Sequence, residues 1–125
     1  MLILDLINKT SSKSVAKQDL SAWIENELEK NGFDDDWQVE VMFVDDTEIK
    51  ALNKKYRKID KATDVLSFPQ FNLLPKKGGG QMLGSIVVSI DQAQKQAADN
   101  NRPLSNEIEF LVRHSTKHLI GIHHD

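Results

Sequence analysis

The chain has 125 residues, of which 39% are hydrophobic and 28% charged, and its formal net charge is −3. These values are typical of a folded globular chain and predict one domain, residues 1–125, around one core. The sequence contains no cysteine, which excludes disulfides, iron–sulfur clusters and thiolate zinc sites. A transition metal would therefore need histidine or carboxylate ligands. The net negative charge does not indicate nucleic-acid binding, so that function must rest on a local basic patch.

The N-terminal segment begins with a short apolar run that Asp5 interrupts. The run is too short to span a membrane, and no basic n-region of a signal peptide precedes it. We therefore expect a strand over residues 2–7 and a cytoplasmic protein without a membrane partner. A helix should follow, with Ser12 or Ser14 as its N-cap, and end near Lys30. The residues expected on its buried face are Leu20, Trp23, Ile24 and Leu28.

The rest of the chain alternates between strand and helix patterns. Residues 37–44 alternate apolar and polar, which predicts a half-buried strand with Trp37, Val39, Val41 and Phe43 on its buried side. The later predicted elements are a helix capped at 45–48, strands over 65–68 and 83–89, a helix capped by Ser89 and Gln92, and a helix from Pro103 to Gly121. The order βαβαββαα predicts an α+β fold, in which helices pack on a small mixed sheet of about four strands.

Three histidines near the C-terminus have the spacing of a metal site. His114 and His118 are four residues apart and so share one face of the last predicted helix. On that helix they lie beside the predicted core stripe of Ile108, Leu111, Val112, Ser115 and Leu119. Gly121 can turn the chain and return His124 toward the same point. The alternative, solvated surface histidines, does not explain the whole pattern, so we predict a zincin-like three-histidine site with an open fourth position.

The spacing H-x-x-x-H-x-x-G-x-x-H is that of the metzincin proteases, which carry their general-base glutamate after the first histidine. This chain has Ser115 at that position. A serine hydroxyl cannot take a proton from metal-bound water near neutral pH. The pattern therefore favours a metal-dependent hydrolase other than a peptidase.

The one strong basic cluster of the sequence lies in residues 50–61, which read KALNKKYRKIDK. Such a cluster can attract a polyanion such as RNA, although cations at a helix C-terminus also offset the helix dipole. The candidate RNA-binding residues are Lys54, Lys55, Lys58 and Lys61, with Arg57 among them. Tyr56 is expected in the core or as a stacking platform.

Several segments together resemble the YbeY family of bacterial endoribonucleases. They are Asn53-Lys54-Lys55-Tyr56-Arg57, the stretch DKATDVLSFP at 60–69, GSIVVS at 84–89 and the histidine motif. The resemblance covers most of the chain in the expected order. It implies a zinc-dependent, single-strand-specific endoribonuclease that acts in 3′-end maturation of small-subunit ribosomal RNA and in ribosome quality control. It also implies that His114, His118 and His124 bind the metal and that Arg57 is the functional arginine of the cleft.

The chain departs from the family pattern H-G-x-L-H-L-x-G-Y-D-H at several positions. Ser115 replaces glycine, Lys117 replaces leucine and His123 replaces aspartate, while Ser85 replaces an aspartate that usually follows the glycine at position 84. His123 is the most consequential change. It adds a competing imidazole beside His124 and removes a carboxylate that could orient the ligands.

These observations predict a mechanism. A metal, zinc by preference although nickel or copper would also bind, would activate water and polarise a phosphoryl oxygen. Arg57 would bind the scissile phosphate, and the four lysines would hold neighbouring phosphates. Thr63, Asp64 and Ser67 are expected to shape the strand and turn beside the cleft. The expected partners are ribosomal RNA and the small ribosomal subunit, not DNA, and the protein is expected to be a monomer. A non-catalytic, metal-stabilised RNA- or ribosome-binding module is the alternative from another class.

Overall fold

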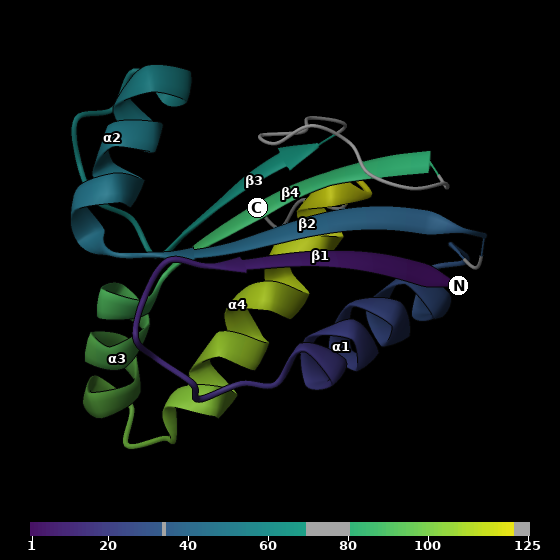
Figure 1. Ribbon diagram of the computed structural model, residues 1–125, viewed down its shortest axis with the longest axis horizontal. Coiled ribbons are helices and arrows are strands. Elements are labelled where there is room, and N and C mark those ends of the chain that lie inside the picture. The colour runs from purple at the N-terminus through teal and green to yellow at the C-terminus, as the bar shows by residue number, and fades with distance from the viewer. Residues whose placement is uncertain (34, 70–80, 122–125) are drawn as a thin grey trace.

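A computed structural model describes residues 1–33, 35–69 and 81–121 (Figure 1). Over these residues the chain forms four strands and four helices in the predicted order. Their bounds are β1 Leu2–Asn8, α1 Lys17–Lys30, β2 Trp37–Val44, α2 Asp46–Arg57, β3 Val65–Pro69, β4 Gln81–Ser89, α3 Ile90–Asp99 and α4 Leu104–Leu119. The predicted α+β class, with a mixed four-stranded sheet, is therefore confirmed. None of the helices in these ranges has both the length and the apolar character needed to cross a membrane.

The sheet has the strand order β1-β2-β4-β3. Strands β1, β2 and β4 are parallel, and β3 pairs antiparallel with β4 at one edge. Helix α1 makes the crossover between the parallel neighbours β1 and β2, since two parallel strands cannot be joined by a tight turn. The edge position of β3 leaves one of its sides without a strand partner among the described residues.

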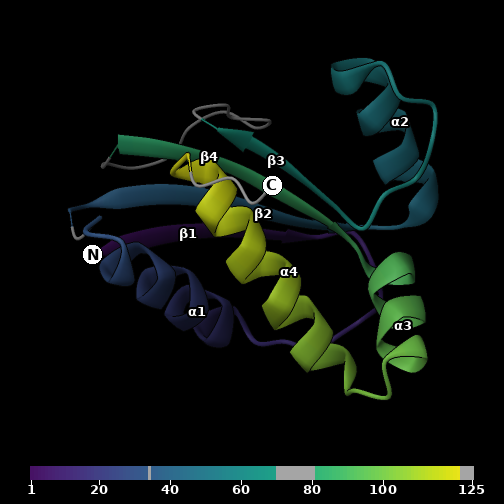
Figure 2. The same cartoon turned by 180° about the vertical axis from the view of Figure 1, so that it is seen from behind.

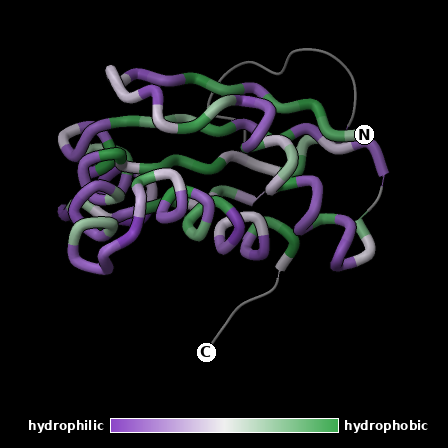
Figure 3. Tube along the Cα trace, turned by 90° about the horizontal axis from the view of Figure 1, so that it is seen from below, coloured by the Kyte–Doolittle hydropathy of each residue, from purple (hydrophilic) through white to green (hydrophobic). Residues whose placement is uncertain are grey.

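Two hydrophobic layers cover the two faces of the sheet. On the first, which we call the α4 face, helices α1 and α4 pack over the strands, and α4 crosses the sheet with α1 alongside (Figure 2). On the opposite face, Ile49 of α2 packs with Met42, Val44, Leu66 and Val87. Figure 3 shows hydrophilic and hydrophobic residues alternating along the coils of the helices.

Strand β2 is buried on both faces, whereas its alternation predicted burial on one side. Every residue from Gln38 to Val44 is buried. The polar side chains on the second face are hydrogen-bonded: Gln38 Nε2 donates to Asp5 (3.0 Å), and the Ser85 hydroxyl donates to Glu40 (2.9 Å). The prediction was wrong because alternation reports the polarity of a face, and a central strand can bury polar groups that find partners.

Helix α1 begins at Lys17, later than predicted, and its N-cap Ala16 makes no side-chain capping bond. The predicted caps were wrong, because Ser12 and Ser14 lie in the preceding turn with their hydroxyls 3.0 Å apart. These polar residues satisfy local turn contacts instead of the helix end. The end at Lys30 and the burial of Leu20, Ile24 and Leu28 are confirmed, while Trp23 is half-buried.

Side-chain caps join the N-terminal ends of α2 and α3. Asp45 accepts a bond from the Glu48 backbone N–H (2.9 Å), and Ser89 accepts one from the Gln92 N–H (3.2 Å), as predicted. The Gln92 side chain does not return to Ser89 but donates to Asp46 (3.0 Å), which also accepts from the Ser89 hydroxyl (2.8 Å). The return bond that a capping box would make from Gln92 to Ser89 is thus replaced by bonds to Asp46. These bonds connect the N-terminal ends of α2 and α3 and fix the start of α2.

Candidate active site

Helix α4 presents two of the predicted metal ligands together. The rings of His114 and His118 lie with their centres 4.5 Å apart and their planes tilted by 53°. Both side chains are half-buried, at the border of a buried stripe that contains Ile108, Leu111, Val112, Ser115 and Leu119. Their predicted shared face beside the core is confirmed. The helix ends at Leu119, and Gly121 has φ +86°, the left-handed turn that the sequence predicted.

The third predicted ligand, His124, lies outside the described residues, as does His123. Within the part of the chain that the structure describes, no three histidine or carboxylate side chains gather closely enough to hold an ion. The two imidazoles fit a nitrogen-ligated ion by their chemistry and by their one-turn separation. Two imidazoles are fewer than the three protein ligands of a catalytic zinc site, so the predicted third ligand would have to come from beyond Gly121.

Strand β3 forms the wall that faces α4. Val65 pairs with Val88 and Ser67 with Ile86, and both partners belong to the hydrophobic layer on the α4 face. Because side chains alternate along a strand, Val65 and Ser67 point toward α4. Leu66 belongs to the layer on the opposite face. The alternation therefore places a small hydroxyl opposite the histidine pair.

A cleft of about 460 Å³ lies between α4, β3 and the end of α2. Its lining residues are Arg57, Asp64, Val65, Ser67, Phe110, Leu111, His114, Ser115 and His118. The predicted arginine and two of the three predicted histidines thus share one cavity, although they come from helices far apart in the sequence.

Arg57 is the last residue of α2 and is exposed. The next residue, Lys58, takes a left-handed conformation (φ +62°, ψ +28°) that ends the helix and turns the chain toward β3. Buried Asn53 donates from Nδ2 to the Lys61 carbonyl (2.9 Å) and holds the return segment against the helix. These contacts place the last turn of α2 beside β3 and aim Arg57 at the cleft.

The Asp64 carboxylate is held by three donors at the cleft wall. They are the Val65 backbone N–H (2.8 Å), the Thr63 hydroxyl (3.3 Å) and the Gln96 side-chain amide (3.2 Å). The Asp64 carbonyl also accepts from the Ser89 N–H (2.9 Å). This pattern agrees with the expectation that Asp64 shapes the turn before β3 and ties it to α3.

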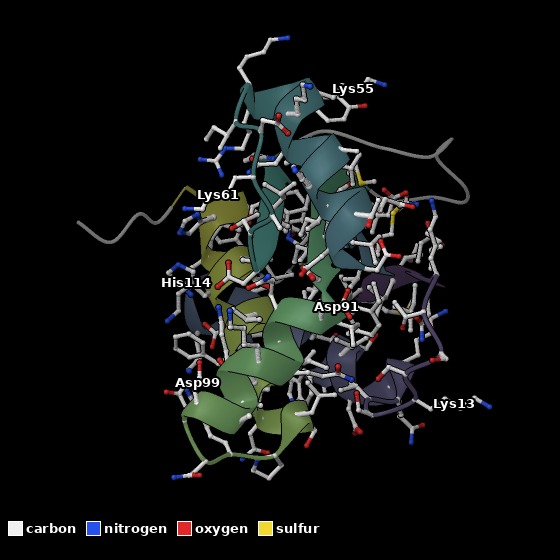
Figure 4. The ribbon with its side chains drawn as sticks, turned by 90° about the vertical axis from the view of Figure 1, so that its left-hand side faces the viewer. Lys13, Lys55, Lys61, Asp91, Asp99 and His114 are labelled. Atoms are coloured by element: carbon white, nitrogen blue, oxygen red, sulfur yellow. The ribbon has the colours of Figure 1, made fainter. Side chains whose placement is uncertain are left out.

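The four lysines predicted to bind RNA are all exposed, but their positions differ. Lys61 lies on the same side of the molecule as His114, and Lys55 projects from the other side of α2 (Figure 4). The Lys55 ammonium lies 5.2 Å from the centre of the Tyr56 ring, and the Lys54 ammonium lies 3.8 Å from the Asp60 carboxylate. Lys58 Nζ is 3.5 Å from the Lys55 carbonyl. Of the two lysines that Figure 4 labels, Lys61 is therefore the one on the side of the cleft.

Arg113 holds α4 against α1 directly behind the histidines. Its guanidinium donates to Glu109 (2.8 Å), Asn26 (3.0 Å) and Glu27 (3.2 Å). Burial alone would lower the pKa of Arg113, but the bonds to Glu109 and Glu27 outweigh it and raise the pKa above its ordinary value. The charge is permanent, so the position of α4 does not depend on a titration of Arg113.

Two of the departures noted in the sequence are buried. Ser115 is 1% exposed and lines the cleft, and its hydroxyl has no hydrogen-bond partner in the described ranges. Ser85 is fully buried and bonds Glu40 of the neighbouring strand. Position 85 itself lacks the aspartate that the family usually has there, but the carboxylate of Glu40 on β2 lies beside it.

Phe110 lines the cleft and was not singled out from the sequence. Its side chain is 52% exposed, and its ring lies parallel to that of His114, with an interplanar angle of 8° and centres 6.2 Å apart. The sequence feature that could have pointed to Phe110 is a large aromatic residue four positions before His114 and outside the apolar stripe. Hydropathy alone assigns such a residue to the core.

Comparison with known proteins decides the family. The sequence profile of the family described as "Endoribonuclease YbeY" matches residues 5–125. The chain belongs to the YbeY endoribonuclease family. Among curated relatives named "Endoribonuclease YbeY", that of Desulforamulus reducens is 36% identical over 95% of this chain and 82% of its own length. Those of Clostridioides difficile and Aquifex aeolicus are 41% and 38% identical, over 78% and 94% of this chain and 65% and 75% of their own lengths.

A solved structure shares the YbeY-family fold found here. The solution structure of a protein from Thermotoga maritima superposes with a TM-score of 0.61 at 25% identity, covering 98% of this chain and 75% of that one. The family resemblance read from the sequence is thus confirmed along almost the whole chain.

Proposed function

We propose that this YbeY-family chain is a metal-dependent endoribonuclease that cleaves single-stranded RNA. The observation that carries the proposal is the meeting of Arg57 with His114 and His118 in one cleft. A guanidinium beside two imidazoles suits a phosphodiester, because it binds phosphate oxygens while nitrogen ligands hold a cation nearby. The names of the relatives support the same activity.

In this proposal His114, His118 and His124 hold the metal. Zinc suits three neutral imidazoles with an open position, and nickel or copper would also bind. A bound zinc ion supplies a Lewis acid for a phosphoryl oxygen and lowers the pKa of water. The chain's own contribution is the placement of these ligands. Helix α4 sets His114 and His118 one turn apart, and Gly121 takes a left-handed conformation just after the helix ends.

The remaining residues of the cleft bind and orient the strand. Arg57 takes the scissile phosphate with its planar fork and offsets charge that develops there during cleavage. Lys61, on the side of His114, holds a neighbouring phosphate without reading a base (Figure 4). Asp64, fixed by three donors, keeps the start of β3 in place. The proposed substrate is small-subunit ribosomal RNA, with roles in 3′-end maturation and ribosome quality control, and the proposed partner is the small ribosomal subunit.

The test is a cleavage assay on matched substrates. The purified monomer or oligomer, as isolated, is given a single-stranded RNA, its duplex, a DNA of the same sequence and casein, each with and without chelator. We expect chelator-sensitive cleavage of the single-stranded RNA alone. His118→Gln should abolish it, while Asn106→Ala, an exposed change near the other end of α4, should not.

The other outcomes identify the rival functions. Tight RNA binding without turnover, with metal present, would indicate a metal-stabilised binding module. Chelator-sensitive cleavage of casein with intact RNA would indicate a peptidase and contradict the proposal.

A further inference from the structure

Phe110 leaves a large apolar surface in contact with solvent at the cleft. Its side chain is 52% exposed, whereas the adjacent Leu111 is buried at 2%. An exposed ring forgoes the stabilisation that burial would give, and apolar surface at the edge of a cleft is typical of a ligand contact. Phe110 lines the same cleft as Arg57 and His114.

The rings of Phe110 and His114 lie parallel to each other and offset. Their planes differ by only 8°, and their centres are 6.2 Å apart. Parallel rings at this separation are displaced sideways by about 5 Å if their faces lie at the van der Waals distance of about 3.5 Å. The imidazole therefore covers little of the phenyl face.

A positive charge lies over the Phe110 ring. The Arg102 guanidinium lies 5.5 Å from the centre of the Phe110 ring, and its Nε is 3.3 Å from the carboxylate of Glu107, which is 2% exposed. The buried carboxylate holds the cation in place. A planar aromatic surface with a neighbouring cation is the combination that binds single-stranded nucleic acid, since bases stack and phosphates pair.

We propose that Phe110, beside His114, is the stacking platform for one nucleobase of the RNA strand, adjacent to the phosphate held by Arg57. This inference rests on the proposed function and adds a subsite to it. A base in a duplex is already stacked on its neighbours, whereas a base of a single strand can turn onto a protein ring. The platform thereby favours unpaired RNA at the cleft, and it tolerates every base because each has a π-face.

The experiment measures binding with chelator present, so that the RNA stays intact. A short single-stranded RNA of the cleaved sequence is compared with versions in which one ribose at a time lacks its base. We expect the wild type to lose about tenfold in affinity at one position near the cleaved bond. Phe110→Leu keeps apolar bulk without an aromatic face and should bind the intact RNA about tenfold more weakly, with no further loss at that position. Phe110→Trp should bind as the wild type does.

The salt dependence separates stacking from charge. Phe110→Leu should leave the slope of log affinity against log salt unchanged, since it removes no cation. Wild-type affinity in Phe110→Leu, or an abasic penalty that persists in that variant, would overturn the platform. If the wild type binds and cleaves RNA and Phe110→Leu binds RNA equally well, the platform is contradicted while the proposed function stands. If the wild type neither binds nor cleaves RNA, the proposed function fails with it.

Discussion

Arg57 differs from the lysines around it in geometry rather than in charge. A guanidinium presents a rigid fork that matches two phosphate oxygens, whereas an ammonium is a point charge. We expect Arg57→Lys to keep the fold and most of the RNA affinity but to lower the single-turnover rate roughly 10²–10³-fold, the effect of one lost transition-state donor. Single-turnover cleavage and equilibrium binding on the same RNA measure the two quantities separately.

A wild-type rate for Arg57→Lys would contradict this role. Arg57 would then be one more cation of the basic segment. The catalytic groups would have to be sought at Asp64, Ser67 and the histidine ligands.

Lys61 and Lys55 form a matched pair, because each substitution by alanine removes one exposed cation. Lys61 lies on the side of His114, whereas the Lys55 ammonium sits by Tyr56 on the other side of α2 (Figure 4). We expect Lys61→Ala to weaken RNA binding and reduce the salt slope by about one, with Lys55→Ala close to wild type. Binding titrations at several salt concentrations measure this. Equal effects of the two variants would mean that the whole segment attracts RNA without a defined path.

Among the elements, α2 ends in a lysine at a capping position where glycine is favoured. Lys58 adopts φ +62° as the helix cap, a conformation that costs a residue with a Cβ about 1 kcal/mol. We expect Lys58→Gly to raise the free energy of unfolding by about that amount while weakening RNA binding. Lys58→Ala should weaken binding without the gain in stability. Denaturant unfolding measures the first effect, and a less stable Lys58→Gly would show that the lysine supports the turn.

Gly84 sets how closely the end of α4 approaches the sheet. A Cβ added there would collide with the Phe68 carbonyl and lie 2.7 Å from Leu119 Cδ2, one residue beyond His118. We expect Gly84→Ala to cost roughly 2–3 kcal/mol in unfolding free energy and to weaken metal binding as α4 shifts. Gly32→Ala is the control: Gly32 has φ +81° with open space around it, so only about 1 kcal/mol of backbone strain is expected. Equal losses would show that the close approach is unimportant.

At the scale of the whole molecule, local patterns predicted the elements, and pairing between distant segments decided the rest. The caps at Asp45 and Ser89 and the buried stripe of α4 were predictable because their contacts lie within a few residues. The position of β3 at the edge of the sheet, antiparallel to β4, was not predictable, because it depends on which strands pair with β4. The burial of β2 on both faces depends on long-range contacts in the same way.

The site divides in the same way. The pairing of His114 with His118 follows from the helical period, so spacing alone predicted it. The cleft follows from tertiary packing, which brings the end of α2 to β3 and β3 to α4 and leaves the Phe110 ring exposed. An aromatic residue reads as core in a sequence whether it is buried or lines a binding site. The place of His124 lies outside the described residues, and its role as third ligand stays a prediction.

We expect one metal ion per chain, held by the histidines, to make the cleft an RNA-cleaving site. The most direct measurement titrates zinc into chelator-stripped protein and records bound metal and single-strand RNA cleavage on the same samples. The account predicts that cleavage rises in proportion to bound zinc and saturates at one ion per chain, with both signals lost in His118→Gln. Full cleavage by the stripped protein, or saturation with one zinc without any cleavage, would contradict it.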